Sequence, residues 1–185
     1  MQIKLLLLDF DGTLADTRRA NTLAYIDALA EEGYELSEDI YMQKYFGMRC
    51  AEFLRDIGYT REEDIDRIRR RKIEIYPNYF NTVRLNKPLL EFAKDFRAQG
   101  GKVWIVSTGH HDNVTNAMHY FGIENEFDGI LTSEDVEHTK PAPDCFLKAM
   151  DIEGVTPAET LIFEDSEIGL EAARRSGAGY FKITL

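Results

Sequence analysis

Short apolar runs alternate with longer stretches of helical periodicity along most of the chain. The first run, residues 3–8, is almost continuously apolar, which is typical of a strand buried on both faces of a parallel sheet. Later apolar runs predict strands at residues 103–106, 129–131, 161–163 and 180–183. Helices are predicted between them at residues 89–99, 111–121, 144–150 and 167–176. This alternation predicts an α/β fold with a parallel sheet.

The stretch between residues 17 and 82 has a different pattern, because it is helical throughout and contains no strand-like run. Ser37 is a predicted helix N-cap, and Thr60 followed by Glu63 has the spacing of a capping box. The segment is too long and too periodic to be a loop. We therefore predict a Rossmann-like α/β core formed by residues 1–15 and 85–185, and an inserted α-helical cap domain formed by residues 16–84.

Polar residues of matching character follow three of the apolar runs. They are Asp9 and Asp11, Ser107 and Thr108, and Glu164 and Asp165. The carboxyl ends of parallel strands meet at one edge of a sheet, and ligands of open α/β folds bind there. The sequence therefore predicts that these three loops form a single site.

Asp9 and Asp11 are only two residues apart, and two carboxylates this close favour either a shared proton or a bound cation. Hard oxygen ligands suit Mg²⁺, which takes one or two carboxylates together with a substrate phosphate. Glu164 and Asp165 would supply further carboxylates. Asp11-Gly12 is also an ordinary turn sequence, so this segment alone does not define a site.

The charge of the chain restricts its partners. With 33 acidic and 22 basic residues, the net charge is −11, which repels nucleic acid, anionic membranes and phosphorylated substrates alike. A phosphate site therefore needs local positive charge from a metal, a lysine or backbone N–H groups. The basic run at residues 67–72 is interpreted as a solvated helix face balanced by nearby acids. No membrane span or signal peptide is predicted, so we expect a cytoplasmic protein.

Four segments resemble, in order, the four sequence motifs of the haloacid dehalogenase (HAD) superfamily. They are DFDGTL from Asp9, VWIVST ending at Thr108, KPAP from Lys140, and FEDS ending at Ser166. The helical insert after the first motif is similar to the C1 cap of this superfamily. The resemblance covers the whole chain and implies a magnesium-dependent phosphotransfer enzyme.

The resemblance also implies catalytic and metal-binding roles. Asp9 would attack phosphorus and form an aspartyl-phosphate, while Asp11 would act as general acid and then as general base. Mg²⁺ would be held by Asp9, the backbone carbonyl of Asp11, and Asp165. Glu164 would be an additional ligand or a support for the others.

Further positions are implied to bind the phosphoryl group. Ser107 and Lys140 would contact its oxygens, together with backbone N–H groups near Gly12 and Thr108. Arg49, in the cap, would reach a distal phosphate or sugar group of the substrate, although a solvated surface arginine is an equally simple interpretation.

Asp11 indicates a phosphatase or phosphomutase, because dehalogenases of the superfamily lack this acid. The chain is most similar to the β-phosphoglucomutase-like group, but three features of its mutases are missing. Asn21 replaces a histidine, the cap loop Gly47–Arg49 is shorter before its arginine, and His110 replaces a lysine. We therefore expect a phosphatase for a small phosphorylated metabolite, acting as a monomer or weak dimer. A phosphomutase and a catalytically inactive binding module are the alternatives.

Overall fold

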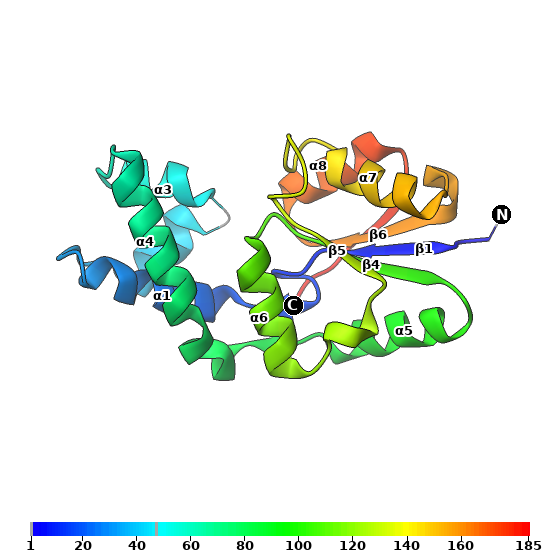
Figure 1. The fold of residues 1–185 in the computed structure, drawn as a ribbon, viewed down its shortest axis with the longest axis horizontal. Helices are drawn as coiled ribbons and strands as arrows, with labels where there is room; N and C mark the ends of the chain where they lie inside the picture. The colour runs from blue at the N-terminus through cyan, green and yellow to red at the C-terminus, as the bar shows by residue number, and fades with distance from the viewer. Residues whose placement is uncertain (1, 47) are drawn as a thin grey trace. The chain divides into compact units, whose positions relative to one another are not determined.

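The computed structural model describes residues 2–46 and 48–185 (Figure 1). The chain forms two compact units. One consists of Met1–Asp16 with Arg84–Leu185 and is an α/β unit, and the other, Thr17–Val83, is helical. Each end of the helical unit lies one residue inside the predicted insert, 16–84.

The α/β unit contains a five-stranded sheet in the order β5-β4-β1-β6-β7. Its strands are β1 (Leu5–Leu8), β4 (Lys102–Val106), β5 (Gly129–Leu131), β6 (Thr160–Glu164) and β7 (Gly179–Lys182). Every neighbouring pair is parallel, which confirms the predicted parallel α/β fold. The four leucines of β1 are at most 1% exposed, as expected for a strand in the middle of a sheet that is covered on both faces.

Helices cover both faces of this sheet. They are α5 (Lys87–Ala98), α6 (His111–Phe121), α7 (Asp144–Glu153) and α8 (Glu167–Ser176). In Figure 1, α7 and α8 lie on one face, and α5 and α6 lie on the other. Small residues of α8, Ala172 and Ala173, pack with Phe146 of α7 against Leu5 and Ile162 of the sheet. The hydroxyl of Ser166 accepts the N–H of Gly169 at 3.1 Å, which caps α8 as its position in the sequence indicates.

A second, two-stranded sheet was not predicted. It pairs β2 (Ala15–Asp16) with β3 (Arg84–Leu85) in an antiparallel arrangement. Asn86 continues the pairing, because its backbone N–H donates to the carbonyl of Leu14 at 2.8 Å and its side chain donates to the carbonyl of Thr13. Strands of two residues leave no periodic signal in the sequence. Their effect is to tie the loop that follows β1 to the start of α5.

The α-helices in the described part of the helical unit are α1 (Arg18–Ala30), α2 (Glu38–Ile40), α3 (Cys50–Asp56) and α4 (Glu62–Ile75). A π-helical turn at Tyr41–Tyr45 follows α2, and a 3₁₀ segment at Tyr76–Thr82 follows α4. Among the described residues, no helix is long and apolar enough to cross a membrane.

One of the two predicted helix caps in this unit is present. Ser37 caps α2, because its hydroxyl accepts the N–H of Ile40 at 3.2 Å. The capping box predicted at Thr60 and Glu63 is wrong, because the N-cap residue of α4 is Arg61. The Arg61 side chain instead donates to the carboxylate of Asp64 at 2.6 Å.

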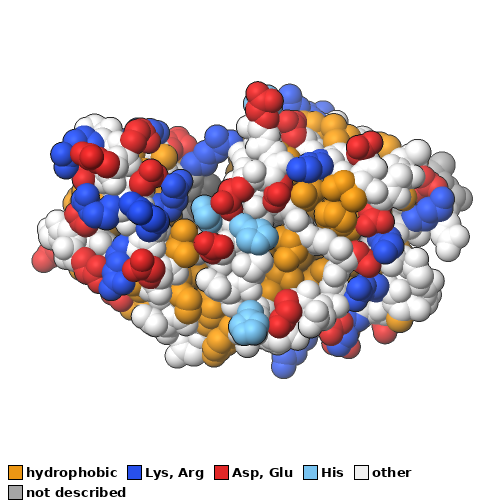
Figure 2. Space-filling view, in the orientation of Figure 1, with side chains coloured by type: hydrophobic (Ala, Val, Ile, Leu, Met, Phe, Trp, Pro, Cys, Tyr) orange, Lys and Arg blue, Asp and Glu red, His pale blue; other side chains and the backbone are white. Residues whose placement is uncertain are grey.

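The basic run in α4 is balanced by acids, as its composition indicates. Arg67 donates to both oxygens of Glu32, just after α1, and to Asp64 in α4, and Arg71 pairs with Glu31. Figure 2 shows the resulting surface, on which basic and acidic side chains of this unit are interspersed. Exposed pairs of this kind contribute little to stability individually. The paired arginines therefore form a solvated helix face, as predicted, but Lys72 at the end of the run does not belong to it, because it is buried and donates to Asn21 Oδ1 at 2.6 Å.

Candidate active site

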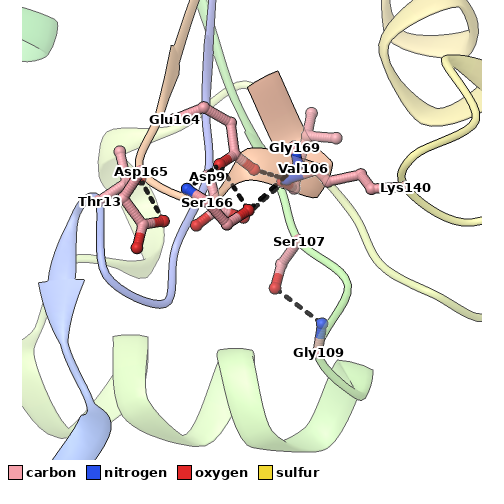
Figure 3. A network of polar contacts seen from close by, with 10 residues as sticks. All are labelled: Asp9, Thr13, Val106, Ser107, Gly109, Lys140, Glu164, Asp165, Ser166 and Gly169. Carbon is pink, nitrogen blue, oxygen red and sulfur yellow. Dashed lines mark hydrogen bonds and ion pairs between the residues drawn. The ribbon is translucent and has the colours of Figure 1, made fainter. Parts of the chain in front are cut away.

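The three predicted loops meet at the carboxyl edge of the parallel sheet (Figure 3). Leu8, the last residue of β1, lies opposite Ile105 of β4 and Phe163 of β6. Because the three strands run in the same direction, the residues that follow them emerge side by side. The backbone N–H of Asp9, for example, donates to the carbonyl of Phe163 at 3.0 Å.

Lys140 lies at the centre of this edge, and its side chain is only 1% exposed. Its ammonium donates to Asp9 Oδ1 at 2.7 Å, to Glu164 Oε1 at 2.6 Å and to the backbone carbonyl of Val106 at 2.8 Å. These three contacts use the three N–H donors of the ammonium. Burial alone would lower the pKa of Lys140, but the charges of Asp9 and Glu164 outweigh burial and hold that pKa above its ordinary value. The lysine is therefore a fixed positive charge.

Asp9, Glu164 and Asp165 form an acidic cluster, with one carboxylate oxygen from each lying within 4.8 Å of the others. Burial raises the pKa of Asp9 well above its ordinary range, Lys140 opposes this shift, and Glu164 adds to it. Burial also raises the pKa of Asp165, and the charge of Glu164 contributes to that shift. One lysine cannot neutralise three carboxylates, so a divalent cation would relieve the remaining repulsion. The oxygen donors and the excess negative charge fit Mg²⁺.

The carboxylate of Glu164 is held on both oxygens by the protein. Oε1 accepts from Lys140, and Oε2 accepts the N–H and the hydroxyl of Ser166 at 2.9 and 3.0 Å. A Cβ on Gly169 would lie 1.9 Å from Oε1, so this carboxylate packs directly against the glycine backbone of α8. In this structure Glu164 therefore orients Lys140, and its predicted contact with a metal is untested.

Gly12 occupies a position where a side chain would not be accommodated. Its φ is +95°, in the left-handed region, and a Cβ would lie 2.2 Å from Asp165 Oδ2. Its N–H already donates to the carbonyl of Ala15 at 2.7 Å. The structure thus gives Gly12 a conformational role, allowing Asp165 to approach the loop, and its predicted role as a phosphate-binding N–H donor stays a prediction.

Ser107 and Asp11 approach the same point from different strands. The buried hydroxyl of Ser107 accepts the N–H of Gly109 at 2.9 Å. A Cβ on Gly109 would lie 3.1 Å from Ser107 Oγ and 3.2 Å from Asp11 Oδ2, so both groups border this glycine. Thr108 is exposed beside them.

Arg49 is not among the residues that the α/β unit brings together. It belongs to the helical unit, where it is exposed and occupies the N-cap position of α3. Its predicted contact with substrate stays a prediction. The predicted cap loop includes Gly47, which lies outside the described residues.

Thr13 and Val106 contribute contacts at the site that were not predicted. The Thr13 hydroxyl donates to Asp165 Oδ1 at 3.3 Å, and the carbonyl of Val106 is the third partner of Lys140. Thr13 stands within the first motif, so its position was a usable signal. A backbone carbonyl leaves no such signal, because every residue carries one.

A buried lysine–carboxylate pair and an acidic cluster at the carboxyl edge of a parallel α/β sheet lie where open α/β folds bind their ligands, which is the arrangement of an enzyme active site. The family described as haloacid dehalogenase-like hydrolase matches residues 6–183. The chain belongs to this family, which confirms the predicted superfamily.

Several relatives of the chain are phosphatases by name. It is 28% identical over 183 residues to fructose-1-phosphate phosphatase YqaB of Escherichia coli, covering 97% of this chain and 96% of that protein. It is 26% identical over 193 residues to phosphoglycolate phosphatase of Aquifex aeolicus, covering 98% and 88%. These relatives support the predicted phosphoric monoester hydrolase.

A solved structure has the same fold. It is that of CbbY from Rhodobacter sphaeroides in complex with phosphate, which matches with a TM-score of 0.86 at 24% identity. The match covers 97% of this chain and 85% of that chain.

Proposed function

We propose that this protein is a Mg²⁺-dependent phosphatase that hydrolyses a small phosphate monoester, such as a sugar phosphate, through a phosphoryl group carried on Asp9. The observation that carries the proposal is the buried contact of Asp9 with Lys140, beside the carboxylates of Glu164 and Asp165. The names of the relatives, a fructose-1-phosphate and a phosphoglycolate phosphatase, support the substrate class.

In the first step, a carboxylate oxygen of Asp9 forms a bond to phosphorus, and the bond between phosphorus and the leaving oxygen breaks. Asp11 gives its proton to that oxygen, so the product leaves as an alcohol. In the second step Asp11 takes a proton from water, and the water oxygen attacks phosphorus. Inorganic phosphate leaves, and the carboxylate of Asp9 is restored. The position of Asp11 beside Gly109 and Ser107 supports its role at the reacting group.

Lys140 stabilises the charge of this reaction. It holds one oxygen of Asp9 at 2.7 Å, which favours the ionised, nucleophilic form of a buried carboxylate. A phosphoryl group next to Asp9 would lie close to the same ammonium, where a fixed positive charge in a buried site has its largest effect. Glu164 keeps the ammonium in place. Ser107 would donate its hydroxyl to a phosphoryl oxygen.

The metal would be held by Asp9, Asp165 and the backbone carbonyl of Asp11. When bound, Mg²⁺ neutralises negative charge on the phosphoryl oxygens. Two features support this site. Carboxylate oxygens already lie within 4.8 Å of one another, and the absence of a side chain at Gly12 leaves room for Asp165.

A phosphate-release assay with purified protein tests the proposal. The panel should include fructose 1-phosphate, 2-phosphoglycolate, pyrophosphate and both anomers of glucose 1-phosphate, with Mg²⁺ or with EDTA. We expect release that requires Mg²⁺ and is lost in Asp9→Asn, but kept in Asp112→Asn, an exposed control of the same chemistry. Conversion of glucose 1-phosphate to glucose 6-phosphate without free phosphate would favour a mutase. No turnover on the panel would contradict the proposal.

A further inference from the structure

The loop that leads from β4 into the first residue of α6, residues 107–111, is held by a second segment, which the proposed mechanism does not use. This segment is Ser133–Glu134, which follows β5. Both the backbone N–H and the hydroxyl of Ser133 donate to the carbonyl of Gly109, at 3.3 and 3.2 Å. The loop and the segment are also joined at the strands, where Ser107 N–H donates to the carbonyl of Leu131 at 2.9 Å.

Glu134 makes the more specific contacts. Its Oε2 accepts the backbone N–H of His111 at 2.7 Å, and its Oε1 lies 3.2 Å from Nε2 of His110. One carboxylate thus bridges two successive residues of the loop. The other ring nitrogen of His110, Nδ1, is buried and has no hydrogen-bond partner among the described residues. Glu134 is therefore the group that orients the His110 ring.

The N–H of His111 is the first of helix α6, a position where helices favour negative charge. Glu134, which lies outside the helix, accepts this N–H and supplies the negative charge. Gly109, in the same loop, borders both Ser107 Oγ and Asp11 Oδ2, so a shift of the loop would move it against both groups. The contacts of Glu134 thus bear directly on the proposed phosphoryl site, although Glu134 itself is exposed.

We propose that Glu134 is a positioning residue for the phosphate-binding loop, holding residues 107–111 through His111 and His110. The inference rests on the proposed phosphatase function, because it assumes that Ser107 binds the phosphoryl group. If Glu134 acted only through its negative charge, it would have the opposite effect on phosphate binding. Removing a carboxylate from the neighbourhood of an anion site should strengthen anion binding, whereas removing a positioning residue should weaken it.

The experiment compares Glu134→Ala, Glu134→Gln and Glu137→Ala. Glu137 is an exposed acid of the same loop, so its variant removes the same charge as a matched control. Binding of inorganic phosphate is measured by calorimetry with Mg²⁺ present, and kcat and KM are measured on the best substrate. Melting temperatures are recorded for all variants.

We expect Glu134→Ala to weaken phosphate binding about tenfold and to lower kcat/KM by a similar factor, a typical effect of losing one charge-assisted hydrogen bond. Glu134→Gln can still accept the His111 N–H through its amide oxygen, and it should stay within about threefold of wild type. Glu137→Ala should match wild type.

Three results would overturn the inference. They are tighter phosphate binding in Glu134→Ala, equal loss in the alanine and glutamine variants, and a lower melting temperature with unchanged binding and kinetics. If wild type binds phosphate but releases none from any substrate, the proposed function fails, and the binding series still tests Glu134.

Discussion

The ammonium of Lys140 lies 2.7 Å from Oδ1 of Asp9, and both side chains are at most 8% exposed. A charged pair is stable in such a place only if its remaining groups are also satisfied. Glu164 and the carbonyl of Val106 meet this condition, because they accept hydrogen bonds from the other two N–H groups of the lysine. The site is thus built around the buried ammonium of Lys140, and the first prediction concerns the removal of this charge.

Lys140→Met should leave Asp9 and Glu164 as buried carboxylates without their counter-charge. Removing one member of a buried ion pair typically costs about 3–5 kcal/mol of unfolding free energy, and we expect a loss of that size in EDTA. Denaturant unfolding measures it. Adding Glu164→Gln to the Lys140→Met variant should recover part of the loss, because it removes one unpaired charge. A Lys140→Met protein as stable as wild type would contradict the buried ion pair.

Gly169→Ala tests the support of Lys140 by Glu164. In an ordinary helix this change stabilises by about 0.5–1 kcal/mol. Here the added Cβ would lie 1.9 Å from Glu164 Oε1, so the carboxylate must move away from Lys140. We expect lower stability and at least a tenfold lower kcat/KM, a loss comparable to that of one oriented donor. Glu171→Ala, at a half-buried position of the same helix, removes a surface ion pair with Arg174 and should be close to neutral. If the Gly169→Ala variant were more stable than wild type and fully active, the observed position of the Glu164 carboxylate would not be required for activity.

Gly12→Ala tests the approach of Asp165 to the first loop. The substitution combines a positive φ with a Cβ that would lie 2.2 Å from Asp165 Oδ2. Gly33→Ala is the matched control, because its φ of +78° gives similar strain while no atom lies within 4 Å of the added Cβ. Both variants should lose about 1–2 kcal/mol from backbone strain. Only Gly12→Ala should also bind Mg²⁺ more weakly, as measured by the Mg²⁺ dependence of phosphate release. Equal Mg²⁺ dependence in the two variants would contradict the assignment of Asp165.

Acid stability should depend on Glu159. The side chain of Lys4 and the N–H and hydroxyl of Thr156 donate to its carboxylate and lower its pKa from the ordinary 4.5 to about 2. A depressed pKa in the folded state means that the contribution to stability is complete above pH 4.5 and is lost as the pH falls towards 2. Glu159→Gln should therefore have a lower melting temperature than wild type at pH 7, by a small margin because the group is near the surface.

The difference in melting temperature between Glu159→Gln and wild type should shrink steadily as the pH falls through this window. Glu137→Gln, an exposed control, should follow wild type at every pH. A difference that stays constant with pH would mean that the carboxylate charge of Glu159 does not contribute.

Much of the α/β unit could be predicted because its central strands, β1, β4 and β6, are largely buried on both faces. The run from Ile3 to Leu8 has no polar alternation, which is typical of a strand buried on both faces. The parallel arrangement then places the residues after each strand together, so Asp9, Ser107 and Glu164 could be assigned to one edge before any coordinates were known. That step needs only the direction of the strands.

The details that were missed depend on individual hydrogen bonds. The expected capping box at Thr60 did not form, because α4 begins one residue later, after Arg61. The side chain of Arg61 pairs with Asp64, and the sequence pattern alone does not reveal this contact. The conformational role of Gly12 was also missed, because the bond from its N–H to the carbonyl of Ala15 leaves no signal in the sequence. Which oxygen of a carboxylate is occupied, as for Glu164, is likewise a property of packing and not of composition.

The central claim is that the phosphoryl group is carried on Asp9, and trapping that group tests it most directly. Asp11→Asn should accumulate the intermediate, because the variant lacks the base that activates water. It would be mixed with Mg²⁺ and a ³²P-labelled aryl phosphate, whose leaving group needs no protonation, then quenched in acid and digested. We predict label on the peptide that contains Asp9, and none when Asp9→Asn is added. Catalytic release of phosphate by an Asp9→Asn protein, or label on any other residue, would contradict the account.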